Sequence, residues 1–151
     1  MNDAGELRRQ LLDLRIELGI LNDRVATACG LRPRDLDILD VIEREGPCTP
    51  THLCARTSIH AATMTGILAR LKDGGWIERI ASPSDGRSAD IASTTRTAEL
   101  RAMYRSADQQ IADLAGGFDP AQRMAISRFL SEAGRIAHDA AEGIVPGAVP
   151  T

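Results

Sequence analysis

Residues 49–88 constrain the fold of this chain more than any other segment. Thr49 and Pro50 suit the N-cap and the first turn of a short helix, and a second helix follows a tight turn. Four apolar residues of the second helix recur at helical spacing: Met64, Ile67, Leu68 and Leu71. Gly74 and Gly75 are typical of a helix end. The segment therefore predicts two short helices joined by a tight turn.

Two short strands are predicted directly after this helix pair. Residues 76–81 and 88–92 flank the sequence Ser-Pro-Ser-Asp-Gly-Arg, which is rich in turn formers. A hairpin with Asp85, Gly86 and Arg87 at its tip is the natural interpretation. In helix–turn–helix proteins, the second helix of such a pair enters the DNA major groove. A cationic hairpin tip suits a narrower groove, so the segment indicates a DNA-binding unit.

The N-terminal segment predicts a long helix with two apolar stripes. One stripe is a heptad seam with spacings of 4, 3, 4, 3 and 4: Leu7, Leu11, Leu14, Leu18, Leu21 and Val25. A second stripe lies on a different face: Leu12, Ile16 and Ile20. Two apolar stripes need two covering surfaces. The helix is therefore either a central core helix or one that packs both on its own domain and on a partner subunit.

Three more helices are predicted on the two sides of the central segment. One begins at Pro33 and ends at Gly46, and another spans residues 95–114. Asp119 and Pro120 suit the N-cap and first turn of the last helix. That helix carries apolar residues at helical spacing: Met124, Ile126, Phe129, Leu130, Ala133, Ile136 and Ala137. The predicted order is thus three helices, a recognition-type helix, a hairpin and two helices.

Length and composition favour one soluble globular domain. The 151 residues are 43% hydrophobic, and no apolar run approaches the roughly 18–20 residues of a membrane-spanning helix. Because the N-terminus lacks a signal-peptide segment, a cytoplasmic location without membrane contact is expected. Aromatic residues make up 3%, which disfavours binding of single strands or RNA through stacking. Residues 56–96 hold 5 Arg and 1 Lys against 4 acidic residues, a net-positive block in a chain of charge −3.

The cysteines and histidines do not form a convincing reactive site. Cys29, Cys48 and Cys54 are expected to be thiols, because no export signal is present. Cys54 is expected to be buried and inert, and Cys48, in a loop, to be the most exposed; redox control through Cys48 or Cys29 is an alternative. His52 and Cys54 lie about 200° apart around a helix, so they cannot share a metal ion. No catalytic or cofactor motif is present, so an enzyme is the least supported class.

Residues 53–79 read LCARTSIHAATMTGILARLKDGGWIER, and a short motif follows them: Asp85, Gly86, Arg87 and Ser88. With these motifs in this order, the chain resembles the MarR family of bacterial transcription regulators over nearly its whole length. The resemblance implies a mainly α fold with a small β-hairpin: a winged helix–turn–helix domain with long N- and C-terminal dimerisation helices. It also implies a homodimer on a near-palindromic operator in double-stranded DNA. Many relatives are repressors that a small, often aromatic or phenolic, ligand releases.

The resemblance also divides the single expected domain, residues 1–151, into parts. Residues 33–94 would form the winged-helix DNA-binding part, and residues 1–30 and 97–142 the dimerisation helices. Residues 143–151, which contain several turn formers, are expected to be a flexible tail. Eight apolar residues would make the dimer contacts: Leu7, Leu11, Leu14, Leu18, Ile126, Phe129, Leu130 and Ile136.

The first turn of the recognition-type helix should point at base edges. Thr63 and Thr65 can meet phosphate, a base acceptor or a thymine methyl, and Ala61 and Ala62 allow close approach. Gly66 stands where many relatives have a basic residue. No Arg, Asn or Gln lies in this turn. Discrimination between DNA sequences is therefore expected to come largely from groove shape and from the wing. The alternative is that the two threonines are ordinary solvent-facing residues.

By resemblance, Arg87 enters the minor groove while Asp85 orients it, and Ser88 completes the motif. The alternative is a solvated hairpin tip. Candidates for phosphate contacts are Arg56, Arg70, Lys72 and Arg79. The sequence therefore predicts a dimeric DNA-binding regulator, and the resemblance implies that it is a repressor. The alternative, motivated by the small residues of the recognition-type helix, is a MarR-like dimer without specific DNA binding that acts as a ligand-binding or protein-interaction module.

Overall fold

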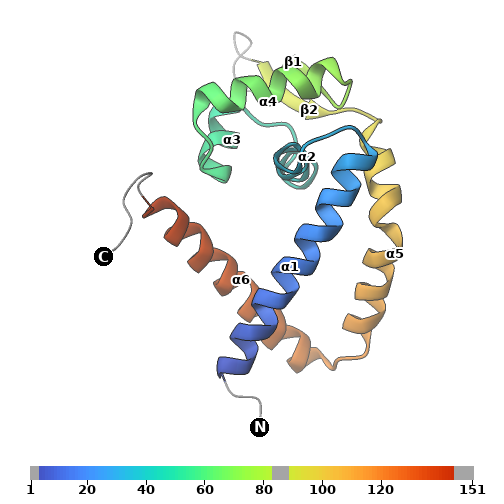
Figure 1. The fold of residues 1–151 in the computed structure, drawn as a ribbon, viewed down its shortest axis with the longest axis vertical. Coiled ribbons are helices and arrows are strands. Elements are labelled where there is room, and N and C mark those ends of the chain that lie inside the picture. The colour runs from blue at the N-terminus through green and yellow to red at the C-terminus, as the bar shows by residue number, and fades with distance from the viewer. Residues whose placement is uncertain (1–3, 83–88, 145–151) are drawn as a thin grey trace. The chain divides into compact units, whose positions relative to one another are not determined.

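The computed structural model describes residues 4–82 and 89–144. In this part the elements follow one another in the predicted order (Figure 1): α1 (Ala4–Ala28), α2 (Pro33–Glu45), α3 (Pro50–Thr57), α4 (Ala61–Asp73), β1 (Ile77–Ala81), β2 (Ala89–Ser93), α5 (Thr97–Gly116) and α6 (Pro120–Glu142). The mainly α fold with a small hairpin is confirmed. The chain divides into two compact units, Met1–Met103 and Tyr104–Thr151, with the boundary inside α5. No helix in the described ranges is long and apolar enough to cross a bilayer.

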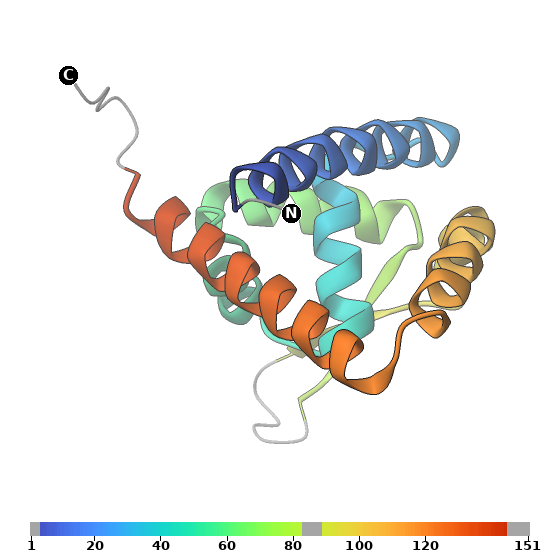
Figure 2. The same ribbon diagram turned by 90° about the horizontal axis from the view of Figure 1, so that it is seen from below.

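The core of the first unit forms around α2. This helix contacts α1, α3 and β2. It lies beneath α4 and the hairpin in Figure 1, and in the centre of Figure 2. The side chains with almost no exposure are mainly aliphatic: Leu36, Ile38, Leu39, Ile42, Leu53, Met64, Leu71 and Ile91. The predicted apolar face of α4 is therefore confirmed as a buried face.

Helix ends follow the predicted caps. The hydroxyl of Thr49 accepts the N–H of His52 at 3.1 Å, at the start of α3. At the start of α6, Asp119 and Gln122 form a reciprocal capping box, with both hydrogen bonds at 2.9 Å. Between α3 and α4, Ser58 turns the chain with a φ of 53°. Because caps use neighbours in the sequence, these ends were readable without tertiary information.

The hairpin is confirmed with slightly shifted strands. β1 and β2 pair antiparallel, with Arg79 opposite Ile91. β1 starts one residue later than expected, because the N–H of Trp76 bonds to the carbonyl of Leu71 and completes the end of α4. β2 ends one residue later than expected, at Ser93. The loop residue Cys48 adds a bridge to Ile91. The predicted tip, with Asp85, Gly86, Arg87 and Ser88, lies outside the described residues, and so does most of the predicted tail.

Two of the helices expected to mediate dimerisation expose large apolar side chains. In α1 only Val25 and Ala26 are buried, both near its C-terminal end, and α6 has no buried residue. The exposed apolar residues of these helices include Leu7, Leu12, Leu14, Ile16, Leu18, Ile20, Met124, Ile126, Phe129, Leu130 and Ile136. The interpretation of α1 as a central core helix is therefore wrong for the single chain.

Glu43 of α2 ties the start of α5 to the core. Its carboxylate accepts the hydroxyl of Thr97 at 3.1 Å and pairs with Arg101. Burial acts to raise the pKa of Glu43. Hydrogen bonds from Ser93 and Thr97, together with the charge of Arg101, outweigh burial and lower this pKa below its ordinary value of 4.5. The ionised form of Glu43 is therefore the stabilising one.

This network predicts an acid-sensitive contribution to stability. Because the folded pKa of Glu43 lies below the unfolded value, its contribution is complete above the unfolded value and is lost as pH falls through the folded value. A Glu43→Gln variant should therefore lose less unfolding free energy than the native chain between about pH 5 and about pH 3. Urea unfolding at a series of pH values measures the difference. If the unfolding free energies of the variant and the native chain fell in parallel as pH is lowered, this role of Glu43 would be contradicted.

Candidate nucleic-acid interface

The outer face of α4 is built from small side chains over a buried apolar face. Met64, Ile67, Leu68 and Leu71 point into the core. The opposite side of the helix is exposed and carries Ala61, Ala62, Thr63, Thr65, Gly66 and Ala69. The structure thus brings all five predicted recognition-helix residues onto one exposed surface. The imidazole at the N-cap position, His60, makes no capping hydrogen bond to α4.

Two details of this face limit what it can contact. The hydroxyl of Thr65 donates to the carbonyl of Ala61 at 2.9 Å, so toward an outside group it acts as an acceptor or through its methyl. A Cβ added at Gly66 would meet no atom within 4 Å. Packing within the chain therefore does not require glycine at this position. The open space above Gly66 lets a flat surface approach the helix backbone closely.

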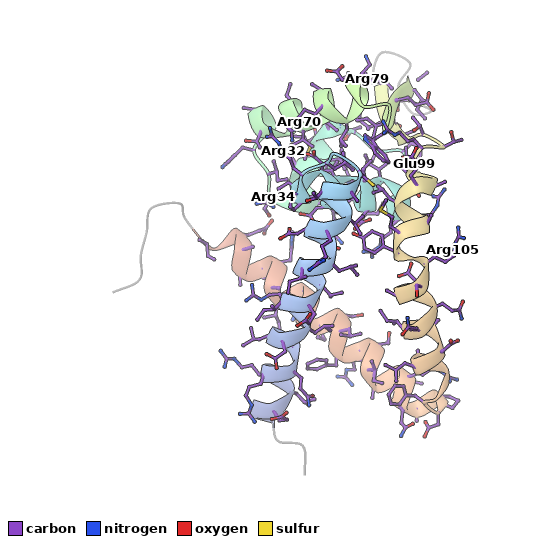
Figure 3. The ribbon with its side chains drawn as sticks, turned by 45° about the vertical axis from the view of Figure 1, so that its right-hand side comes forward. Arg32, Arg34, Arg70, Arg79, Glu99 and Arg105 are labelled. Carbon is purple, nitrogen blue, oxygen red and sulfur yellow. The ribbon has the colours of Figure 1, made fainter. Side chains whose placement is uncertain are left out.

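Of the four candidates for phosphate contacts, two are bonded to carboxylates and two are not. Arg56 donates to Glu45 at 2.8 Å, and Arg70 donates to Asp35 at 2.6 Å. Lys72 and Arg79 are exposed, and no carboxylate of the described residues pairs with them. In Figure 3, Arg70 and Arg79 lie at the same end of the first unit. Lys72 and Arg79 are thus the more available cations for an external phosphate.

A small ion-pair cluster joins the end of α2 to α3. Glu45 bonds to His52 at 2.6 Å and to Arg56 at 2.8 Å. The hydrogen bond from His52, followed by that from Arg56, lowers the pKa of Glu45. The cluster is exposed, so its net contribution to stability is small. The hydrogen bond to Glu45 nevertheless directs the Arg56 guanidinium toward the end of α2.

Hollows lie on two sides of α4. One, of about 430 Å³, lies between α4 and β1, and its lining includes Lys72, Asp73, Glu78 and Arg79. The other, of about 180 Å³, lies between α3 and α4 and includes Cys54 in its lining. Lys72 and Arg79 in the larger hollow are balanced by two carboxylates. The larger hollow beside α4 therefore carries no net positive charge from these four side chains.

The cysteines differ from expectation. Cys48 was expected to be exposed, but it is buried, because its backbone N–H and carbonyl both bond to Ile91, at 3.1 and 2.8 Å. Cys54 was expected to be buried and is only half-buried, at the edge of the smaller hollow. Burial raises the pKa of Cys48 and of Cys29, whose thiol lies 3.7 Å from the sulfur of Met103. Raised thiol pKa values leave little reactive thiolate at neutral pH.

Sequence reasoning missed two features around this surface. Asp35 is buried within the apolar stripe of α2; a charged residue in that stripe was the available signal. The Cζ atom of Arg96 lies 4.2 Å from the centre of the Trp76 ring, and the Arg96 guanidinium donates to the carbonyl of Gly74 at the end of α4. No local pattern indicates this second contact, since its partners lie some twenty residues apart. Both features hold α4 to the rest of the unit.

Comparisons with known proteins agree with this geometry. A family model described as MarR family matches residues 30–88. The uncharacterized HTH-type transcriptional regulator YcgE of Bacillus subtilis (strain 168) is 25% identical over 146 residues, 93% of this chain and 95% of that protein. An HTH-type transcriptional regulator of Mycobacterium tuberculosis (strain CDC 1551 / Oshkosh) is 33% identical over 75 residues, 50% of this chain and 52% of that protein.

Solved structures show the same fold. The crystal structure of Streptococcus pneumoniae FabT in complex with DNA superposes with a TM-score of 0.66 at 18% identity, covering 91% of this chain and 99% of that one. A transcriptional regulator from Thermotoga maritima, Tm0710, gives a TM-score of 0.62 at 21% identity, covering 90% and 96%. At these identities the likeness is one of fold.

Proposed function

Because this chain belongs to the MarR family of winged helix–turn–helix transcriptional regulators, we propose that it binds a near-palindromic operator in double-stranded DNA as a homodimer. The observation that carries the proposal is the exposed face of α4, where five small residues lie opposite a fully buried apolar face. A helix of this shape, next to a two-strand hairpin, suits insertion into the major groove.

Sequence readout by α4 would rest on methyl groups and close approach. Ala61 and Ala62 can touch thymine methyls, and Thr63 and Thr65 can meet phosphate or a base acceptor. Bidentate contacts from Arg, Asn or Gln discriminate between bases by about 1–3 kcal/mol each, and this face offers none. Discrimination would therefore depend on groove shape and on the wing, where Arg87 would enter the minor groove.

The exposed apolar faces of α1 and α6 support the homodimer. A monomeric protein rarely leaves this many large aliphatic and aromatic side chains exposed on two helices. A second copy would cover them, and a twofold axis would place two α4 helices on successive half-sites. We further propose a cytoplasmic repressor that a small aromatic or phenolic ligand releases from DNA, as in many family members.

The direct test is footprinting of the intergenic region upstream of the gene, followed by fluorescence anisotropy on the protected fragment. A sequence-specific regulator should protect one near-palindromic site and bind it about 10³-fold or more tightly than unrelated DNA at physiological salt. Affinity should fall steeply as salt rises. If no site is preferred, the alternative of a ligand-binding or protein-interaction dimer replaces this proposal. Ala61, Ala62 and Gly66 motivate that alternative, because they offer no side-chain hydrogen bond to a base.

A Gly66→Ala substitution should change stability and DNA affinity in opposite directions. The added methyl meets no atom within 4 Å, so the variant should be more stable by about 0.5–1 kcal/mol, the usual advantage of alanine over glycine in a helix. If α4 lies close to the bases, the same methyl intrudes on the DNA, and operator affinity should fall by about tenfold in a dimer with two copies. Thermal melts and anisotropy measure the two effects.

Gly134→Ala on α6 is the matched control for this substitution. An added Cβ at Gly134 also meets no atom within 4 Å. The control should remain a dimer in sedimentation, and it should show a similar gain in stability and unchanged operator affinity. If Gly66→Ala also left affinity unchanged, this face of α4 would not approach the bases.

A further inference from the structure

Two acceptors on the protein hold the guanidinium of Arg70. It lies in the second half of α4, and its side chain is 39% exposed. One terminal nitrogen donates to Asp35 at 2.6 Å, and the other donates to the carbonyl of Gly66 at 3.3 Å. Its Nε is buried without a hydrogen-bond partner. The guanidinium of Arg70, one of the four candidates for phosphate contacts, therefore faces α2 as well as solvent.

Asp35 uses both carboxylate oxygens to connect two helices. Its side chain is 3% exposed, and it occupies the third position of α2. One oxygen accepts from Arg70, and the other accepts the backbone N–H of Arg32 at 3.1 Å, where α2 begins. A carboxylate near a helix N-terminus is favourably placed with respect to the helix dipole. One buried group thus joins the start of α2 to α4.

The packing of α4 explains why this connection matters. Its main contacts are with α3 and β1, and the Asp35–Arg70 pair is an ionic link from α4 to α2. Moving Arg70 to a phosphate would leave Asp35 buried and unpaired. Because the carboxylate is buried, removing its only ion-pair partner among the described residues is costly, even though the Arg70 side chain is itself partly exposed. The pair is therefore expected to persist when DNA binds.

We propose that Asp35 and Arg70 are positioning residues that set the orientation of α4 on α2 for operator recognition. The proposal rests on the proposed DNA binding and deepens it: Arg70 acts on specificity through the helix, not through a phosphate contact. Lys72, on the same helix and with no carboxylate partner among the described residues, provides the contrasting case of a cation available to DNA.

The test compares Asp35→Asn, Arg70→Met and Lys72→Gln with the native protein. Affinity is measured by anisotropy for the footprinted operator and for an unrelated duplex, from about 50 to about 300 mM salt. Asp35→Asn and Arg70→Met should each weaken operator binding by about tenfold or more at every salt concentration, with an unchanged salt slope and unchanged binding to the unrelated duplex. The salt slope is the change in the logarithm of the binding constant with the logarithm of the salt concentration. Lys72→Gln should flatten this slope by about 0.9 for each phosphate that the lysine neutralises, on both duplexes.

The sign of the Asp35→Asn effect decides between positioning and direct contact. If Arg70 contacted phosphate, Asp35→Asn would free it and remove a negative charge, so both duplexes would bind more tightly. Arg70→Met would then flatten the salt slope. Either result would overturn the proposal. Unchanged operator binding in both variants would overturn it as well, while leaving the proposed function intact, whereas absence of a preferred site in the native protein would sink the function itself.

A folding control keeps the test decisive. Circular dichroism and thermal melts establish that each variant is folded at the assay temperature. If Asp35→Asn does not fold, Arg70→Lys is compared with Arg70→Met, since lysine retains a charge for Asp35. Recovery of operator affinity with Arg70→Lys, at an unchanged salt slope for both variants, supports positioning. A slope that flattens with Arg70→Met and recovers with Arg70→Lys shows direct phosphate contact.

Discussion

A Phe129→Glu/Leu130→Glu double variant should sediment as a monomer and lose operator affinity by more than about a hundredfold. Both side chains are exposed on α6, at 44% and 51%, and α6 has no buried residue. The substitutions therefore spare the core of the single chain. In a dimer, each side chain would contribute about 1.5–3 kcal/mol by burial, and two carboxylates there would need desolvation. A monomer reaches only one half-site, so loss of the dimer lowers operator affinity.

Arg128→Glu is the control for this variant. Arg128 is exposed on α6, and at about 100° per residue it lies away from the face shared by Ile126, Leu130 and Ala133. The Arg128→Glu variant should remain dimeric and bind the operator with nearly native affinity. A double variant that stays dimeric would place the interface elsewhere. A monomeric variant with native affinity would show that DNA binding does not need the dimer.

An Arg87→Ala variant should lose about 10²- to 10⁴-fold in operator affinity without a change in thermal stability. A hydrogen bond from a charged group contributes about 1.5–3 kcal/mol, and a symmetric dimer would lose two of them, about 3–6 kcal/mol in all. Arg87 belongs to the segment between β1 and β2, beyond the described residues, and its proposed role rests on the resemblance of the Asp85–Ser88 motif. Anisotropy at matched salt is the measurement.

Arg105→Ala removes the same charge from an exposed site on α5, outside the winged-helix part. Its operator affinity should remain close to native. Equal losses in the two variants would indicate a general charge effect. No loss with Arg87→Ala would remove the wing from the mechanism and leave α4 as the main contact.

Local signals explain why so much of the fold was predictable. The caps at Thr49 and Asp119 and the glycines after α4 act on backbone groups within a few residues, so they locate helix ends directly. The 3.6-residue period of α4 likewise located its buried face, and therefore the exposed face that carries Thr63 and Gly66. The hairpin followed from its turn formers.

Long-range contacts explain what sequence reasoning missed. Cys48 looked like an exposed loop residue, yet its backbone pairs with Ile91 of β2. Arg70 looked like a free surface cation, yet Asp35 of α2 holds it. Nothing within a helical turn of either residue reveals its partner. Composition and spacing therefore could not show which arginine and lysine side chains are free to contact DNA.

The amino-acid sequence by itself determined the order of helices and hairpin, the two faces of α4 and the resemblance to a family. Each depends on periodicity or on groups that are adjacent along the chain. Only the tertiary structure decided which charges are already paired and which thiols are buried. Those properties depend on partners brought together by packing: Asp35 with Arg70, and Cys48 with Ile91.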